Sequence, residues 1–137
     1  QSFCVDKEKT FLIGFSNGSF FINELAKIRS EKIAGIIPIA GGGGGGTKPV
    51  SALVIHSQND GTVGYGSGVG SLEAWAQSAK CSAYDLSKFP LDDCSFLDSC
   101  EKTVGFCPWH QTQAGQGTHD WPRFKTANGF IANFLMQ

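Results

Sequence analysis

A G-F-S-N-G stretch at residues 14–18 constrains the fold of this chain more than any other feature. An apolar run at residues 10–13 precedes it, and apolar side chains with helical spacing follow it over residues 20–28. A strand, a sharp turn and a helix in this order raise the hydroxyl of the central Ser16 above the edge of a sheet. We expect glycine at both ends because side chains there would clash with neighbouring backbone. We also expect the N–H groups of the helix N-terminus to face Ser16.

The rest of the chain alternates between short apolar runs and amphipathic stretches, which predicts an α/β fold with a parallel sheet flanked by helices. Strands are predicted at 10–15, 33–39 (ended by Pro38), 52–55 and 103–107, and helices at 18–29, at 71–80 and from about residue 121 to the C-terminus. In the last helix we expect a buried stripe of Phe124, Ala127, Ile131 and Leu135, with Pro122 in the first turn. Residues 61–70 contain many glycines and predict a loop.

A serine hydroxyl is a weak nucleophile unless a base takes its proton and an acid orients that base. The chain has three histidines, and His119 fits the base best because it follows a strand-like run and precedes the last helix. His110 is its main rival. His56 is interpreted as structural, bonding the turn that carries Asp60. A solvated loop position for His119 remains an alternative.

Asp60 follows the predicted strand at 52–55, where an acid would lie at the carboxyl end of a sheet strand. Ser16, Asp60 and His119 thus come after successive strand-like runs, in the order Ser, acid, His that is typical of a catalytic triad on such a sheet. The alternative for Asp60 is an ordinary turn residue, since Asn-Asp-Gly favours turns.

Four segments, at residues 11–18, 36–41, 56–60 and 117–122, together resemble a secreted esterase group. That group contains polyhydroxybutyrate depolymerase-like enzymes and feruloyl and acetylxylan esterases. The resemblance implies an α/β-hydrolase-type sheet with Ser16 as nucleophile, Asp60 as acid and His119 as base, and with the N–H of Asn17 as an oxyanion donor. It implies hydrolysis of carboxylic esters, small or polymeric, without a cofactor or a metal.

The chain departs from the pattern of that group in two places. Ser19 stands where the group often has glycine, and no histidine precedes Ser16, whereas the group has an upstream His-Gly segment that supplies the second oxyanion N–H. We therefore expect residues 1–137 to be the C-terminal part of a single catalytic domain, lacking the N-terminal strands. An exposed apolar sheet edge is the expected consequence, and we expect the isolated piece to be unstable or to pair with the missing N-terminal half.

Charge and hydropathy exclude several classes of partner. The formal net charge is −1 and no basic stripe runs between the aromatic residues, so we expect no nucleic acid partner. No apolar segment approaches the roughly 20 residues of a membrane span, so we expect no membrane association either.

Four of the five cysteines, at 81, 94, 100 and 107, fall in one irregular stretch. They predict two disulfides, with three possible pairings, and hence a secreted, extracellular or periplasmic location. Cys4 makes the count odd, and its partner is expected in the missing region. The alternative is a zinc site around Cys107-x-x-His110, although the spacings form no paired C-x-x-C hooks.

Six glycines in a row at residues 41–46 are followed by Thr47 and Lys48, which suggests a phosphate-binding loop. The order of Thr and Lys is reversed and Pro49 blocks the helix that such a loop requires, so a flexible connection with weak order is predicted instead. Trp109 and Trp121 flank the proposed base and are predicted to line the substrate pocket, with core or lid packing as the alternative.

Two further function classes stay open at this point. A peptidase or acyltransferase would share the elbow and the triad, and differ in substrate. A non-catalytic binding protein would keep the fold without an activated serine.

Overall fold

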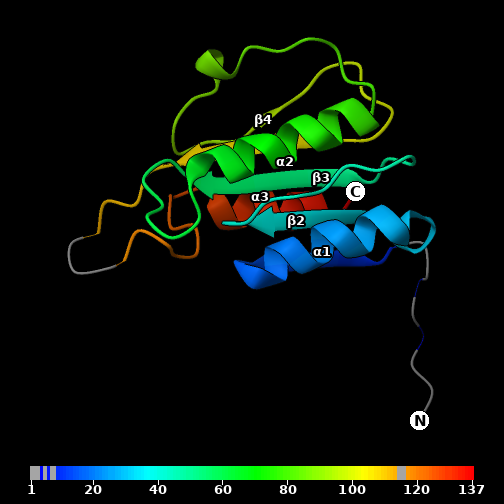
Figure 1. The fold of residues 1–137 in the computed structure, drawn as a ribbon, viewed down its shortest axis with the longest axis horizontal. Helices are drawn as coiled ribbons and strands as arrows, with labels where there is room; N and C mark the ends of the chain where they lie inside the picture. The colour runs from blue at the N-terminus through cyan, green and yellow to red at the C-terminus, as the bar shows by residue number, and fades with distance from the viewer. Residues whose placement is uncertain (1–3, 5, 7–8, 114–116) are drawn as a thin grey trace.

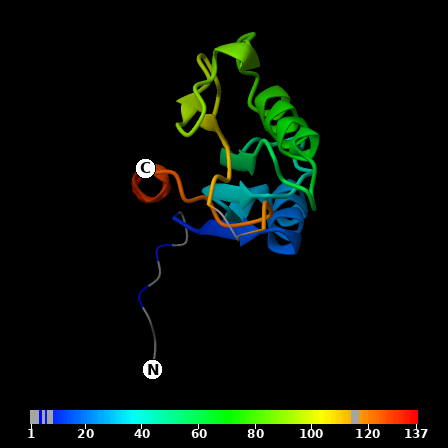
Figure 2. The same ribbon diagram turned by 90° about the vertical axis from the view of Figure 1, so that its left-hand side faces the viewer.

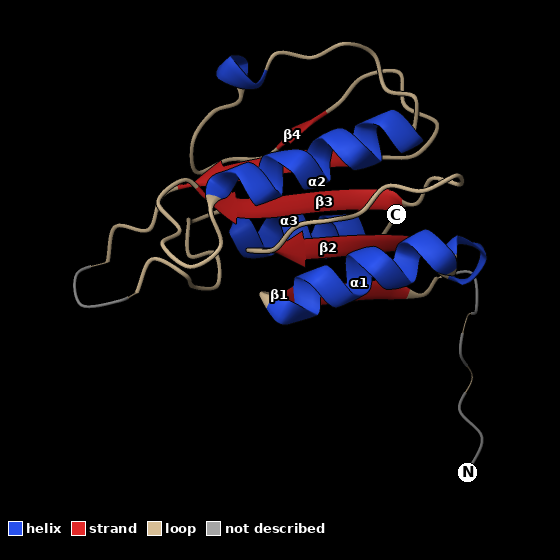
Figure 3. Ribbon diagram, viewed as in Figure 1, coloured by secondary structure: helices blue, strands red, loops and turns tan. Residues whose placement is uncertain are grey.

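The computed structural model describes residues 4, 6, 9–113 and 117–137. Its centre is a five-stranded sheet in the order β1-β2-β3-β5-β4 (Figures 1 and 3). The strands are β1 (Phe11–Phe15), β2 (Gly35–Ile39), β3 (Ser51–Ser57), β4 (Ser95–Phe96) and β5 (Val104–Trp109). All neighbouring strands pair in parallel except β4, which is antiparallel to β5.

Helices cover both faces of this sheet. α1 (Asn17–Ile28) and α2 (Tyr65–Ser78) lie on one face and α3 (Ala127–Leu135) lies on the other (Figure 2). Two short 3-10 turns, η1 (Ser30–Lys32) and η2 (Leu86–Lys88), complete the elements. Each face buries its own apolar cluster, one against α1 and α2 and one against α3. The prediction of a parallel α/β sheet flanked by helices is confirmed.

The first strand and helix lie close to where the sequence predicts them. β2 begins two residues later than the strand predicted at 33–39, and β3 extends beyond the predicted 52–55 at both ends. β2 continues through Pro38 to Ile39 instead of ending at the proline. Pro38 lies opposite Gly14 of β1, and the recorded β2–β3 pairs pass from Ile36 to Ile39. Proline is tolerated here because the ladder omits a pairing at its position.

The prediction of a loop at 61–70 is wrong over its second half, because α2 begins at Tyr65. Gly66, Gly68 and Gly70 lie inside the helix, where their low propensity disfavours it locally. Gly68 is required for packing, since a Cβ there would come within 2.5 Å of the His56 ring. Close contact between α2 and β3 therefore overrides the local preference.

The prediction of a last helix from residue 121 is also wrong, because α3 begins at Ala127 and Pro122 lies in the preceding loop. The predicted stripe is buried at Phe124, Ala127 and Ile131, and partly buried at Leu135. Phe134, which the prediction omitted, is 1% exposed and packs edge-on against Phe11 of β1.

The glycine run at 41–46 is packed against the helices, contrary to the prediction of a weakly ordered connection. Asn23 of α1 donates to the carbonyl of Gly42 at 2.9 Å and accepts from the Trp75 indole of α2 at 2.8 Å. Gly44 has a φ of +106°, and a Cβ there would come within 2.3 Å of the Trp75 indole nitrogen. Only glycine fits this conformation and this close approach.

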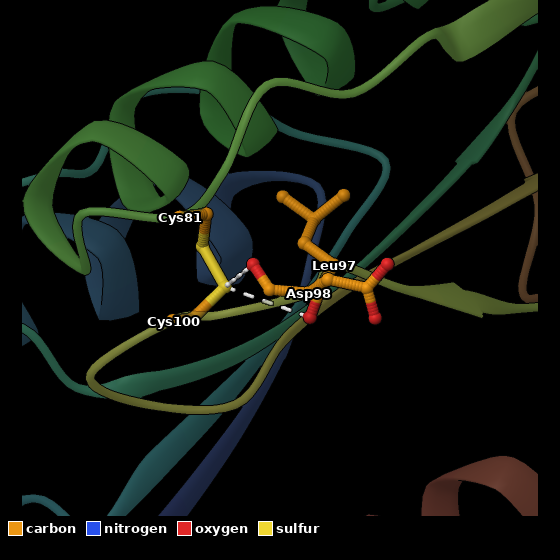
Figure 4. The surroundings of a disulfide bond; sticks show 4 residues. All are labelled: Cys81, Leu97, Asp98 and Cys100. Atoms are coloured by element: carbon orange, nitrogen blue, oxygen red, sulfur yellow. Dashed lines mark hydrogen bonds between the residues drawn. A yellow bond between two sulfur atoms is a disulfide. The ribbon is translucent and has the colours of Figure 1, made fainter.

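Two disulfides stabilise residues 81–107, as predicted, and the structure selects one of the three pairings. Cys81 pairs with Cys100, and Cys94 pairs with Cys107. The Cys100 sulfur lies 3.6 Å from the carbonyl oxygens of Leu97 and Asp98 (Figure 4). Because Cys107 is disulfide-bonded, the alternative zinc site around it is wrong. Cys4 is exposed and has no disulfide partner among the described residues.

The β1 edge of the sheet carries apolar side chains that are open to solvent. Ile13 of β1 is 41% exposed, and α1, which packs on β1 and β2, exposes Phe21 and Ile28 by 65% and 69%. This edge bears the expected apolar surface.

None of the described helices is both long and apolar enough to cross a bilayer.

Candidate active site

Ser16 lies at a strained turn between β1 and α1. Its backbone has φ 53° and ψ −119°, a conformation that L-residues rarely adopt outside functional sites. The turn is held on both sides, since Ser16 N–H donates to the Ile39 carbonyl at 2.9 Å and the Ser16 carbonyl accepts from Ser19 N–H at 2.9 Å. The hydroxyl therefore projects from a backbone that the surrounding sheet and helix fix in place.

The two glycines of the motif play different parts. A Cβ at Gly14 would lie 2.2 Å from the carbonyl oxygen of Gly18, so glycine is required at the first position. A Cβ at Gly18 would meet nothing within 4 Å, and the prediction of a clash there is wrong. What Gly18 contributes to the turn is its carbonyl, against which Gly14 packs.

The imidazole of His119 lies between a hydroxyl and a carboxylate. Its Nε2 is 2.8 Å from the Ser16 hydroxyl oxygen and its Nδ1 is 2.8 Å from the Asp60 Oδ2. An ionised carboxylate only accepts, so Nδ1 carries the proton and Nε2 is left to accept from the serine hydroxyl. The structure thus brings together the three predicted residues, although Asp60 and Ser16 lie 59 and 103 positions before His119 in the chain.

Asp60 is held by the turn that follows β3. Its Oδ1 accepts from the N–H groups of Thr62 and Val63, each at 2.9 Å, and its side chain is fully buried. Thr118 accepts from Gly61 N–H at 2.9 Å, which joins the Asp60 turn to the loop that carries His119. Oδ2 is thereby oriented towards His119 while Oδ1 is satisfied by the backbone.

The Phe15 ring packs against the His119 imidazole, a contact that was not predicted from the sequence. Its ring centroid lies 4.9 Å from that of His119, with an interplanar angle of 35°. The Trp121 ring lies 6.4 Å from that of Phe15, and Trp121 is 38% exposed. Phe15, whose residue type the G-x-S-x-G pattern leaves open, thus contacts a residue 104 positions further along the chain. No local signal in the sequence indicates this contact.

Asp120 anchors the loop that presents His119. Its carboxylate accepts from Trp121 N–H at 2.7 Å and from the Gln111 amide at 3.1 Å, and it pairs with Arg123 at 2.9 Å. The Trp121 N–H, and then Arg123 and Gln111, hold the pKa of Asp120 below its ordinary value. The carboxylate therefore stays ionised and keeps its partners at neutral pH.

The other predicted residues lie apart from this cluster or at its margin. His110 is exposed just beyond β5 and lines a cavity of about 330 Å³ with Asp92 and Arg123. Trp109 is 2% exposed and packs on Phe124 at 6.4 Å between centroids, the core packing that was the alternative to a pocket wall, although it also borders that cavity. Asn17 is the first residue of α1, where helix geometry leaves its N–H without an intrahelical partner.

Across the described part of the chain, no three His, Cys, Asp or Glu side chains gather in a way that could hold a metal ion. The cluster itself is a hydroxyl, an imidazole and a carboxylate in hydrogen-bonded series. Such a series can pass a proton from the hydroxyl to the imidazole while the carboxylate stabilises the imidazolium.

Esterases are among the known proteins to which this chain is similar. The chain is 29% identical over 125 residues to a probable feruloyl esterase C of Aspergillus clavatus, a match that covers 85% of this chain and 44% of that protein. The crystal structure of a thermostable esterase superposes with a TM-score of 0.62 at 16% identity, over 96% of this chain and 31% of the other. The chain thus spans less than half the length of either protein. No family model matches it.

Proposed function

Starting from a chain that is a distant homologue of feruloyl esterase C and has the fold of the esterase group of α/β-hydrolases, we propose that this protein is a serine hydrolase of carboxylic esters. The observation that carries the proposal is the position of the His119 imidazole, 2.8 Å from both the Ser16 hydroxyl and the Asp60 carboxylate. The strained backbone of Ser16 supports it.

In the proposed reaction, Ser16 Oγ attacks the ester carbonyl while His119 Nε2 takes the hydroxyl proton. Asp60 keeps the proton of the resting imidazole on Nδ1 and stabilises the imidazolium that forms. His119 then protonates the departing alkoxide, which leaves an acyl group on Ser16. Water attacks this acyl-enzyme, gives its proton to Nε2 and releases the acid, and Ser16 regains its proton.

The negative charge of the tetrahedral intermediate falls on the former carbonyl oxygen. The Asn17 N–H, at the N-terminus of α1, is the proposed donor to that oxygen, and a second donor is expected from outside this chain. Removing one such donor raises the barrier by roughly 2.7–4 kcal/mol, so the second donor is needed for full activity.

The substrates that we propose are feruloyl or acetyl esters of plant polysaccharide, or hydroxyalkanoate polyesters. Trp121 is a candidate for one wall of the pocket because it is partly exposed and lies beside Phe15, whose ring contacts His119. A contribution from Trp109 would require its ring to be reached through the cavity that His110 lines. The two disulfides support a secreted or periplasmic location. That the chain is the C-terminal part of one catalytic domain stays a prediction.

Substitution of the nucleophile tests the proposal. Ser16→Ala should abolish hydrolysis of p-nitrophenyl esters and labelling by a fluorophosphonate, because only an activated serine reacts readily with that probe. Ser82→Ala, at an exposed serine, is the matched control and should leave both unchanged. Hydrolysis at the wild-type rate in a folded Ser16→Ala protein would refute the assignment.

The same assays separate the remaining alternatives. A complete wild-type protein, including the part expected to supply the second oxyanion donor, that does not label would indicate a binding protein that keeps the hydrolase fold. A protein that labels, but cleaves peptides or transfers acyl groups in preference to hydrolysing esters, would indicate a peptidase or an acyltransferase.

A further inference from the structure

His56 is a buried histidine that the proposed reaction does not use. It lies near the carboxyl end of β3, is 0% exposed, and precedes Asp60 by four positions. Its Nε2 is 2.8 Å from the Val63 carbonyl oxygen and 3.7 Å from the Asp60 Oδ2. Because a carbonyl oxygen only accepts, Nε2 must carry the ring proton and donate it to Val63.

Val63 connects this histidine to the acid of the site. Its carbonyl accepts from His56, and its own N–H donates to the Asp60 Oδ1 at 2.9 Å. The hydrogen-bonded series therefore runs from His56 through Val63 to Asp60, and from there to His119 and Ser16. Loss of the His56 donor would leave the Val63 carbonyl without this partner and free the turn that orients the carboxylate.

The packing around His56 fixes its ring in this role. The Tyr65 ring meets it edge-on at 6.1 Å between centroids, and α2 approaches so closely at Gly68 that a Cβ would come within 2.5 Å of Nδ1. Nδ1 has no hydrogen-bond partner among the described residues, although the Gly41 backbone faces the ring. Among the described residues, the hydrogen bond of this ring is the one that Nε2–H donates to the Val63 carbonyl.

The ring also has to be neutral, so that it does not compete with His119 for the carboxylate. Burial lowers the pKa of His56, and this effect outweighs the opposite effects of the Val63 carbonyl and the Asp60 carboxylate. His119 and Tyr65 are the other titratable groups that face it. A neutral His56 thus leaves the Asp60 carboxylate free to pair with His119.

We propose that His56 is a positioning residue, which holds the Val63 carbonyl through Nε2–H and so fixes the Asp60 carboxylate on His119. The proposal rests on the proposed function, since it assigns His56 to the support of the same hydroxyl, imidazole and carboxylate. It concerns orientation, and no bond to substrate is assigned to His56.

Two amides test the donor. Glutamine places its amide nitrogen near the position of Nε2, whereas the asparagine side chain is too short and reaches only as far as Nδ1. We expect His56→Gln to keep the far-downfield NMR resonance of the His119 Nδ1–H, which reports its hydrogen bond to a carboxylate. We expect His56→Asn to lose or broaden it, and to label with a fluorophosphonate about ten-fold more slowly.

His110→Asn is the matched control, at an exposed histidine, and should leave the resonance and the labelling rate unchanged. The proposal is overturned if folded His56→Asn keeps both at wild-type level, or if folded His56→Gln loses as much as His56→Asn. If thermal unfolding shows that His56→Asn does not fold, the test depends on His56→Gln alone: a kept His119 Nδ1–H resonance supports the proposal and a lost one overturns it. Failure of both variants to fold, with His110→Asn folded, also overturns it, since His56 would then serve the fold as a whole.

The two readouts separate this proposal from the function on which it rests. A wild-type protein that does not label, but whose Nδ1–H resonance is lost in His56→Asn and kept in His56→Gln, would refute the esterase proposal and leave the positioning role intact. A wild-type protein that labels, and whose Nδ1–H resonance is the same in both variants at residue 56, would refute the positioning role and leave the esterase proposal intact.

Discussion

The two lateral edges of the sheet are built in opposite ways. At one edge lies β1, a five-residue strand whose outer side has no partner strand among the described residues. Ile13 on this strand and Phe21 and Ile28 on the adjoining α1 are open to solvent. Ser16, the proposed nucleophile, follows directly from this edge strand.

The opposite edge is short and covalently closed. β4 has only two residues, it pairs antiparallel with β5, and the Cys94–Cys107 disulfide joins its N-terminal side to β5. The Cys81–Cys100 disulfide joins the residues after α2 to those before β5. Short edge strands and covalent bonds are common ways of preventing a sheet from pairing further.

This difference indicates which edge is the more open to pairing with another strand. The β4 edge is short, whereas the β1 edge offers a longer strand without a partner among the described residues, together with apolar side chains. The proposed catalytic cluster joins the β1 edge to the inner strands, because Ser16 follows β1 while Asp60 and His119 follow β3 and β5.

The largest expected effect comes from breaking the elbow at the open edge. Gly14→Ala would place a Cβ 2.2 Å from the Gly18 carbonyl oxygen, so we expect it to reduce the free energy of unfolding by more than about 3 kcal/mol or to prevent folding. Gly18→Ala is the matched control, because its Cβ meets nothing within 4 Å and alanine favours a helix, with an expected gain of about 0.5–1 kcal/mol. Chemical denaturation measures both, and a folded Gly14→Ala of wild-type stability would contradict this account of the turn.

Opening the closed edge should have the next largest effect. Replacing Cys94 and Cys107 together by alanine should lower the free energy of unfolding by about 3 kcal/mol, since the bridge constrains a short loop in the unfolded chain. Cys4→Ser, at an exposed cysteine without a disulfide partner among the described residues, should change it by less than about 0.5 kcal/mol. Equal stability of the double variant and the wild type, in urea denaturation without reductant, would show that this edge does not depend on its disulfide.

What the sequence predicts well is decided by local chemistry. The β1–turn–α1 unit is recognisable because an apolar run, two glycines and a helical apolar spacing lie within one short stretch. Asp60 and His119 could be selected because parallel strands bring the residues that follow them to one rim. The three side chains then meet as their order along the chain suggests.

What the sequence predicts poorly depends on contacts between distant segments. The first turns of α2 contain glycines that are unfavourable locally, and of these Gly68 is explained by its close approach to His56. The glycine run is ordered by Asn23 and Trp75, and Phe15 is placed against His119 by the whole sheet. Disulfide pairing is likewise a tertiary choice, because all three pairings are compatible with the spacing.

Placing a lysine on each edge strand should have the smallest effect on stability. It also compares the two edges most directly. Ile13→Lys replaces a 41% exposed side chain of β1, and Phe96→Lys replaces a 42% exposed side chain of β4. We expect Ile13→Lys to change the free energy of unfolding by no more than about 0.5 kcal/mol but to reduce concentration-dependent self-association, because a lysine on an edge strand opposes pairing with another chain. Phe96→Lys should leave association unchanged, since a two-residue strand offers little backbone to pair with. The Phe96 ring packs over Gly105, and its loss weakens that contact.

Sedimentation velocity over a range of concentrations measures the self-association of both variants. A wild-type protein that stays monomeric throughout, or a Phe96→Lys variant that dissociates as fully as Ile13→Lys, would mean that the β1 edge is no more open than the β4 edge.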